Sequence, residues 1–119
     1  MITARALALF LLLLGNCGCG PSASPQDAAA VAAAATAAPA DARLAKLYAQ
    51  TCKACHAAAG SGAPLALDKA AWSARLAQGD KTLLEHAING YKGMPPMGSC
   101  PDCSETEFSA LIRFMSGTS

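Results

Sequence analysis

The stretch that decides the fold is CKACH, residues Cys52 to His56, within AQTCKACHAAAGSGAPL (residues 49–65). Two thiols at this spacing can each add to a vinyl group of one haem, and the adjacent His56 then places its imidazole where it can ligate the iron. A thioredoxin-like pair would follow a β-strand, which is not indicated here, and a structural zinc site would need two more ligands nearby. The motif therefore predicts one covalently bound haem c, attached through Cys52 and Cys55.

Eight residues after His56 the sequence reaches Pro64, through a segment that contains Gly60 and Gly62. The glycines allow the chain to fold closely back over the haem, and the proline stiffens it. A metal-bound histidine usually donates its second ring N–H to an acceptor, which fixes the ring plane. We therefore predict that the Pro64 carbonyl accepts a hydrogen bond from His56 Nδ1–H, with a merely flexible loop as the alternative.

Composition limits the class of protein. The chain has 119 residues, six cysteines and nearly balanced charge, with nine Lys and Arg against eight Asp and Glu. This length fits one small domain plus an additional segment. No basic stripe is present to neutralise phosphates, which argues against a nucleic-acid partner. The cysteine content indicates an oxidising compartment, or metal or haem chemistry.

The N-terminus, residues 1–19, predicts an export signal. Its apolar run, Ala6 to Gly15, is too short to span a bilayer as a mature helix but suits a signal peptide. The run ends in LLGNCGCG, which resembles a bacterial lipoprotein signal, with Cys17 favoured over Cys19 as the lipidated residue. A plain cleaved signal is the alternative. We expect a periplasmic protein, with membrane attachment through an N-terminal lipid as the finer expectation.

Residues 20–40 form an Ala/Pro-rich linker, and residues 41–119 form the folded domain. The linker has almost no large apolar side chain and cannot build a core, although its alanines favour transient helix. In the domain, apolar periodicity predicts four short helices. Asp41, Asp80 and Ser104 are the expected N-caps of the first, third and fourth, and the second is expected to begin near Asp68. Ser104 and Glu107 have the spacing of a capping box. No segment alternates with period two, so the predicted fold is all-α.

The segments YAQTCKACH, GAP, DKAAW, NGYKGMPPMG and CPDCSETE, followed by an amphipathic terminal helix, resemble the class I monohaem cytochromes c. Within that family they are most similar to the cytochrome c5-like branch, over about Leu47 to Met115. The resemblance implies a small cytochrome c fold, with about four short helices around one haem, a histidine on one side of the iron and a methionine on the other.

The second axial ligand follows from the resemblance. In the family it is the methionine of a Met-Pro-Pro run, which corresponds to Met94, and a thioether there raises the reduction potential. Pro95 and Pro96 stiffen the loop. Family members usually have a basic residue in place of Met97, which makes Met97 a second candidate. His86 is a third, through bis-histidine ligation.

A second cysteine pair, Cys100 and Cys103, is followed by Ser104 and not by histidine, so a second haem is not expected. From the residues alone a redox-active dithiol stays open, because a helix N-terminus lowers thiol pKa values. The resemblance and the oxidising compartment favour a structural disulfide, which would connect the methionine loop to the last helix.

Other side chains receive weaker expectations. The resemblance places Tyr48 at a helix crossing near Phe114. Trp72 is expected in the core beside the haem, with its N–H on a propionate or with no role beyond packing. Three basic residues either surround the haem edge and attract an acidic partner or are scattered surface charges: Lys53, Arg75 and Lys92.

No catalytic constellation is apparent, and the two axial ligands leave the iron no free site, so we expect no enzyme. The sequence favours an exported one-electron carrier between respiratory-type redox partners, such as a membrane oxidase or reductase or other cytochromes. Three alternatives stay open: a haem sensor or weak peroxidase in which Met94 dissociates, a cytochrome subunit of a larger redox enzyme, and a non-haem disulfide protein.

Overall fold

The fold is that of a computed structural model, in which the structure of residues 25–118 is described. The predicted export signal, including Cys17 and Cys19, lies outside these residues. In chain order the α-helices are α1 (Pro25–Thr36), α2 (Ala42–Leu47), α3 (Lys53–His56), α4 (Lys69–Leu76), α5 (Asp80–Asn89) and α6 (Glu105–Ser116). A π-helical segment, Tyr48–Cys52, joins α2 to α3, and a 3₁₀ turn, Pro96–Ser99, lies before α6.

The described residues contain no β-strand, only an isolated bridge between Tyr91 and Met94. The all-α prediction is therefore confirmed. The first predicted helix is one helical segment made of α2, the π turn and α3. No helix within residues 25–118 combines the length and the apolar character needed to cross a membrane.

Two of the three predicted N-caps are present, those at Asp41 and Ser104, and Asp68 caps the helix that was expected to begin near it. Asp41 accepts the Leu44 N–H at 2.8 Å, Asp68 caps α4, and Ser104 caps α6 in a full capping box. The prediction for α5 is wrong, because Gly79 occupies the N-cap and Asp80 is the first helical residue. The backbone enters α5 with a φ of 89° at Gly79, which glycine adopts without strain. The Asp80 carboxylate then lies in the first turn, where the helix dipole favours negative charge.

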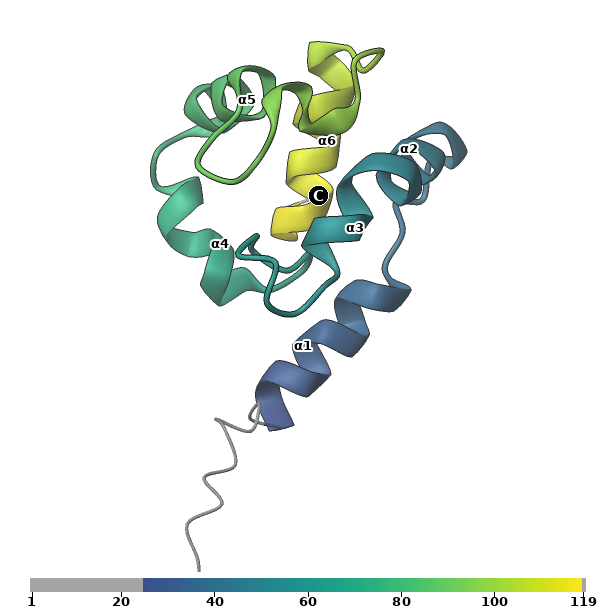
Figure 1. Ribbon diagram of the computed structural model, residues 1–119, viewed down its shortest axis with the longest axis vertical. Helices are drawn as coiled ribbons and strands as arrows, with labels where there is room; N and C mark the ends of the chain where they lie inside the picture. Colours follow the sequence, from purple (N-terminus) through teal and green to yellow (C-terminus); the bar gives the residue numbers. More distant parts are fainter. Residues whose placement is uncertain (1–24, 119) are drawn as a thin grey trace, which may run out of the picture.

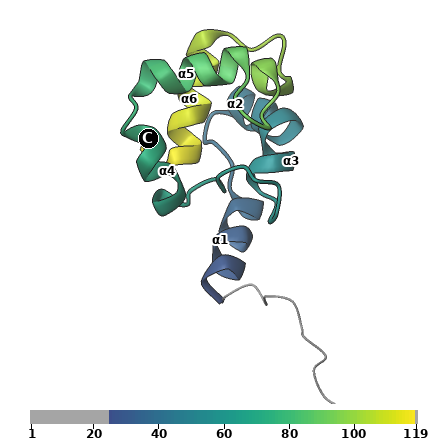
Figure 2. The same cartoon turned by 60° about the vertical axis from the view of Figure 1, so that its left-hand side comes forward.

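Helix α6 runs through the middle of the domain, with α2 and α3 on one side and α4 and α5 on the other (Figures 1 and 2). The rings of Tyr48 and Phe114 meet edge to face with centroids 5.0 Å apart, as the resemblance implied. Two clusters make the core. The larger includes Tyr48, Trp72, Leu83, Leu111 and Met115, and the smaller consists of Ala87, Cys100, Cys103 and Phe108. Because α6 contributes to both clusters, it connects the two halves of the domain.

Much of the predicted linker is helix α1, which projects from the domain in both ribbon views (Figures 1 and 2). One residue departs from the expectation that this tract adds nothing to a core. Ala34 is fully buried and belongs to the larger cluster. Its small side chain lets the helix backbone approach the domain closely at this residue.

Candidate haem site

The two cysteines of the CKACH motif lie at the junction between the π-helical segment and α3. Both are free thiols; Cys52 is half-buried and Cys55 is exposed. The Lys53 N–H donates to the Tyr48 carbonyl, the wide i→i−5 bond that joins the two helical segments. Burial raises the pKa of the Cys52 thiol, against a smaller lowering by its contact with the Thr51 hydroxyl at 3.4 Å. The junction thus presents two unpaired thiols three residues apart on one helical segment.

The His56 side chain is buried and its ring is oriented by one hydrogen bond. Nδ1 lies 2.8 Å from the Pro64 carbonyl oxygen, so the structure contains the contact that the sequence predicted. Burial lowers the His56 pKa, the Pro64 bond opposes this, and the nearby Arg75 charge lowers it further. A neutral imidazole that donates from Nδ1 has Nε2 as its lone-pair nitrogen, which is the form that ligates a metal.

The loop after His56 is fastened to the domain at several points. The Ala66 N–H donates to the His56 carbonyl at 2.7 Å, and the Ser61 hydroxyl donates to the Cys55 carbonyl at 2.7 Å. Trp72 Nε1 donates to the Leu65 carbonyl at 2.9 Å. Indole has a single N–H, so the suggestion that Trp72 binds a propionate is wrong, and core packing is the correct alternative. The Trp72 ring also stacks near His56, with centroids 5.9 Å apart.

Met94 lies on the loop that follows α5. Its N–H donates to the Tyr91 carbonyl at 2.9 Å, and its carbonyl accepts from the Tyr91 N–H at 3.0 Å. The side chain is half-buried and packs against the smaller cluster, as does that of Met97. A Cβ at Gly90 would lie 3.0 Å from the Met94 carbonyl oxygen, and a Cβ at Gly98 would lie 3.0 Å from Met94 Cε. The loop therefore closes tightly around Met94 from both ends.

Comparison with known proteins agrees with a haem-binding role for these residues. A protein-family model described as cytochrome c oxidase, cbb3-type, subunit III matches residues 39–115. Cytochrome c5 of Ectopseudomonas mendocina is 44% identical over 73 residues, which cover 60% of this chain and 84% of that protein. Cytochrome c-555 of Chlorobaculum tepidum is 38% identical over 76 residues, 60% of this chain and 70% of that protein. The chain belongs to the class I monohaem cytochromes c.

A solved structure supports the same fold. The crystal structure of an electron transfer complex of nitrite reductase with cytochrome c contains a similar chain at 36% identity and a TM-score of 0.57. The match covers 66% of this chain and 95% of that chain. The cofactor of this cytochrome is one covalently bound haem c, as in its family.

The residues present fit this cofactor. Two free thiols can attach the vinyl groups of a c-type haem, and a buried imidazole and a thioether are the side chains that ligate its iron. The buried Tyr48 hydroxyl has no hydrogen-bond partner among the residues that the structure describes. Such an orphaned polar group in a native core calls for an additional partner, and a haem brings polar groups of its own into this core.

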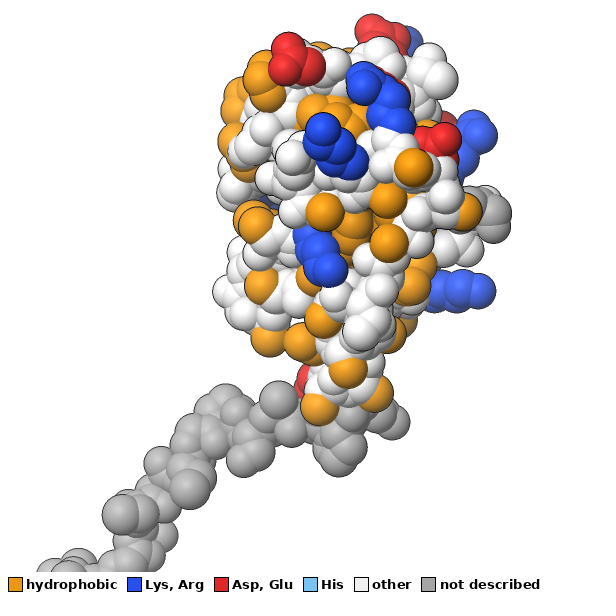
Figure 3. All heavy atoms as spheres, turned by 90° about the vertical axis from the view of Figure 1, so that its right-hand side faces the viewer, with side chains coloured by type: hydrophobic (Ala, Val, Ile, Leu, Met, Phe, Trp, Pro, Cys, Tyr) orange, Lys and Arg blue, Asp and Glu red, His pale blue; other side chains and the backbone are white. Residues whose placement is uncertain are grey.

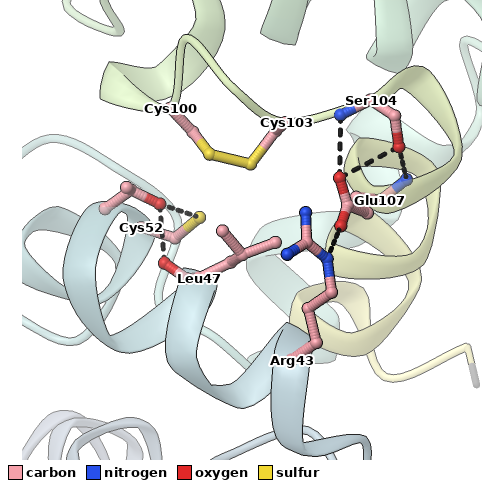
Figure 4. The surroundings of a disulfide bond; sticks show 8 residues. Arg43, Leu47, Cys52, Cys100, Cys103, Ser104 and Glu107 are labelled. Atoms are coloured by element: carbon pink, nitrogen blue, oxygen red, sulfur yellow. Dashed lines mark hydrogen bonds and ion pairs between the residues drawn. A yellow bond between two sulfur atoms is a disulfide. The ribbon is translucent and has the colours of Figure 1, made fainter.

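The second cysteine pair forms a disulfide, so the predicted bond between Cys100 and Cys103 is confirmed. Cys100 and Cys103 are bonded, with Cα atoms 5.4 Å apart, and both are buried. Figure 4 shows the bond facing the α2–α3 segment, where Leu47 packs against the smaller cluster. The chain passes from this disulfide directly into the capping box of α6. The methionine loop is thereby joined covalently to the start of the central helix.

The start of α6 is also connected to α2, by an ion pair between Glu107 and Arg43. Glu107 accepts from the Ser104 N–H at 2.9 Å and pairs with the Arg43 guanidinium, as the dashed lines in Figure 4 show. The backbone bond from Ser104, followed by the Arg43 and Ser104 side-chain bonds, lowers the pKa of Glu107 to about 2. This carboxylate is therefore ionised throughout the physiological range.

Sequence reasoning missed the surroundings of His86. Weighed as an alternative axial ligand, its ring instead stacks on Tyr91, with centroids 3.9 Å apart. Lys92 Nζ lies 5.2 Å from the Tyr91 ring centroid. A histidine five residues before a tyrosine, across the expected helix end at Gly90, was the available signal, but the path of the chain after Gly90 could not be read from the sequence.

The three basic residues considered for a docking edge lie on separate elements. Lys53 is on α3, Arg75 is on α4 with its guanidinium bonded to the Ala71 carbonyl, and Lys92 is beside Tyr91. On the face drawn in Figure 3, lysine and arginine side chains are interspersed with acidic, hydrophobic and uncharged surface and form no continuous basic patch.

Proposed function

We propose that this cytochrome is an exported one-electron carrier in which His56 and Met94 are the axial ligands of the haem iron. The observation that carries the proposal is the buried His56 ring with Nδ1 bonded to Pro64, because this bond assigns Nε2 to the metal. The relatives with this sequence pattern are named cytochromes c5 and c-555, and none of these names denotes an enzyme. The haem supplies reversible one-electron transfer.

Each site residue has a separate task in this proposal. Cys52 and Cys55 attach the macrocycle through thioether bonds, which keeps the cofactor in place independently of its oxidation state. Pro64 fixes the plane of the His56 ring and increases the basicity of Nε2. The Met94 loop supplies the sulfur and excludes water from its side of the pocket. With both axial positions occupied, the protein exchanges electrons and offers substrates no open coordination site.

The test compares Met94→Ala with Met97→Ala in the haem-containing protein. The near-infrared band of a sulfur-to-iron bond is expected to disappear in Met94→Ala, with a lower reduction potential, because a thioether ligand raises the potential. Met97→Ala is the matched control, since Met97 lies on the same loop and packs against the same cluster. Loss of the band in Met97→Ala alone would assign the ligand to Met97.

Redox proteins are the partners that we propose. The crystallised neighbour forms an electron transfer complex with nitrite reductase, and by analogy this cytochrome would bind a larger reductase or oxidase, or another cytochrome, through a small transient interface. Isolation of the tagged protein with its partners under native conditions tests this.

A second function is favoured by the description of the matching family model, which names an oxidase subunit. A subunit would copurify with its enzyme in fixed stoichiometry through a high-salt wash, whereas a carrier would dissociate. Stoichiometric recovery would therefore favour the function of an oxidase subunit over that of a free electron carrier.

Periplasmic location and membrane attachment belong to the same proposal. Export followed by lipidation at Cys17, with Cys19 as the second candidate, would leave residues 20–40 as the connection between membrane and domain. Such a tether raises the effective concentration of the domain near membrane-bound partners. Mass spectrometry of the mature N-terminus distinguishes lipidation from simple cleavage, and Cys17→Ala, compared with Cys19→Ala, identifies the modified residue.

A further inference from the structure

The His86–Tyr91 pair lies outside both core clusters. His86 comes from the last turn of α5, and Tyr91 follows the glycine that ends this helix. Their rings are 3.9 Å apart and within 15° of parallel, although Tyr91 is 39% exposed. Burial of apolar surface alone does not account for a stack of two rings at the surface, because much of the Tyr91 ring stays in water.

Tyr91 is also the backbone partner of Met94. Its N–H and its carbonyl both bond Met94, so the two residues are connected by a reciprocal pair of hydrogen bonds. Between them, Lys92 has a φ of 54°, a strained value that persists only where neighbouring contacts enforce it. The position of the Met94 backbone is therefore set by the position of Tyr91.

We propose that the His86–Tyr91 stack is a positioning element for the axial methionine. His86 is part of helix α5, its imidazole stacks on the Tyr91 ring, and the Tyr91 backbone is hydrogen-bonded to Met94. His86 thus acts on the haem environment through two intermediate contacts and does not ligate the iron. This inference rests on the proposed function, because it takes Met94 as the axial ligand.

The expected consequence is a change in how readily Met94 leaves the iron. Without the stack, the turn from Tyr91 to Met94 loses its attachment to α5, and the dissociated form of the loop becomes more populated. An external ligand such as imidazole competes with Met94 only in that form. An aromatic pair of this kind is worth enough to change the apparent imidazole affinity by about twofold to tenfold.

The experiment is an imidazole titration of the ferric, haem-containing protein. His86→Ala is expected to bind imidazole about twofold to tenfold more tightly than the wild type, and His86→Phe, which keeps a flat ring, is expected to stay near the wild type. Tyr91→Ala repeats the test from the other ring. Glu85→Ala is the matched control, since Glu85 is exposed on the same helix and pairs only with Lys81 in the structure.

The possible outcomes distinguish a failure of this inference from a failure of the proposed function. A wild-type protein without a sulfur-to-iron band would overturn both, because Met94 would then not be the ligand. A wild-type band together with unchanged or weaker imidazole binding in His86→Ala and Tyr91→Ala would overturn the positioning role alone. Equal affinities in His86→Phe and His86→Ala would show that ring stacking is not the cause. Denaturation of each variant shows whether a change in affinity accompanies general unfolding.

Discussion

The two sides of the haem site are built in different ways. His56 is on a helix next to both attachment cysteines, and within ten residues the chain returns to bond its ring and its backbone. Met94 is on a loop that includes the positive-φ residues Lys92, Met97 and Ser99, and its position depends on contacts with α5 and on the disulfide before α6. The histidine side is locally determined, whereas the methionine side depends on tertiary contacts. Substitutions should therefore alter the proposed bond between Met94 and the iron more easily than the proposed bond between His56 and the iron.

The largest expected effect is that of Gly90→Ala. Gly90 has φ 83° and ψ 153°, a region that is essentially restricted to glycine, and a Cβ there would meet two backbone atoms, the Met94 oxygen and the Pro96 nitrogen, at 3.0 Å. The substitution is expected to lower the free energy of unfolding by about 4 kcal/mol, from strain and overpacking together. It should also abolish the sulfur-to-iron band, because the loop must move. Guanidinium denaturation and the near-infrared spectrum measure the two effects.

Gly79→Ala is the control for this prediction. Gly79, at the other end of α5, has nearly the same backbone angles, but a Cβ there would meet nothing within 4 Å. Gly79→Ala should lose only the free energy of unfolding that backbone strain costs, about 2 kcal/mol, and its sulfur-to-iron band should be unchanged. Equal losses of stability and of the band in both variants would mean that the loop does not pack on Gly90 as described.

Removal of the disulfide has the next largest effect. The double variant Cys100→Ala/Cys103→Ala is expected to lose about 2 kcal/mol of unfolding free energy, since the bond closes only a short loop. The band should weaken, because the loop would no longer be joined to α6. A sulfur-to-iron band of unchanged strength in the double variant would contradict the idea that the disulfide helps to position Met94.

Most of the local structure could be predicted from the sequence, because its signals act within one helical turn. The CKACH motif, the cap at Asp41 and the capping box at Ser104 each depend on side chains at most four residues apart. The same reasoning failed at Asp80, where a good capping side chain suggested the boundary but the positive φ of Gly79 determined it. Sequence alone gives no backbone angle.

Contacts between elements were predicted less well. Trp72 donates to Leu65 instead of a propionate, because the loop after His56 passes beside α4, a path that composition does not specify. The His86–Tyr91 stack depends on how Gly90 reverses the chain, and the burial of Ala34 depends on where α1 meets the domain. Tyr48 and Phe114 were paired correctly only because the family resemblance supplied the crossing.

On the His56 side of the haem site, Trp72→Phe tests whether a loss of stability leaves the proposed bond between Met94 and the iron intact. The variant keeps a buried ring but removes the donor to the Leu65 carbonyl, which should cost about 1 kcal/mol. The sulfur-to-iron band should be unchanged. Ser73→Ala, an exposed neighbour on α4 whose hydroxyl bonds only within its own helix, should have almost no effect. A weakened band in Trp72→Phe would mean that the two sides of the site are coupled.

The smallest effect concerns the pH dependence of the connection between α2 and α6. Folding lowers the Glu107 pKa from its ordinary value of 4.5 to about 2, chiefly through the Ser104 backbone bond and then through Arg43. A carboxylate with a lowered folded-state pKa stabilises the protein above pH 4.5, and this contribution is lost as the pH falls towards 2. The wild type should therefore be more stable than Glu107→Gln at neutral pH, and the difference should shrink on acidification through this window. Denaturation of both proteins, repeated across the pH range, measures this difference. A difference between wild type and Glu107→Gln that stays constant down to pH 2 would mean that the Ser104 and Arg43 bonds do not hold this carboxylate ionised.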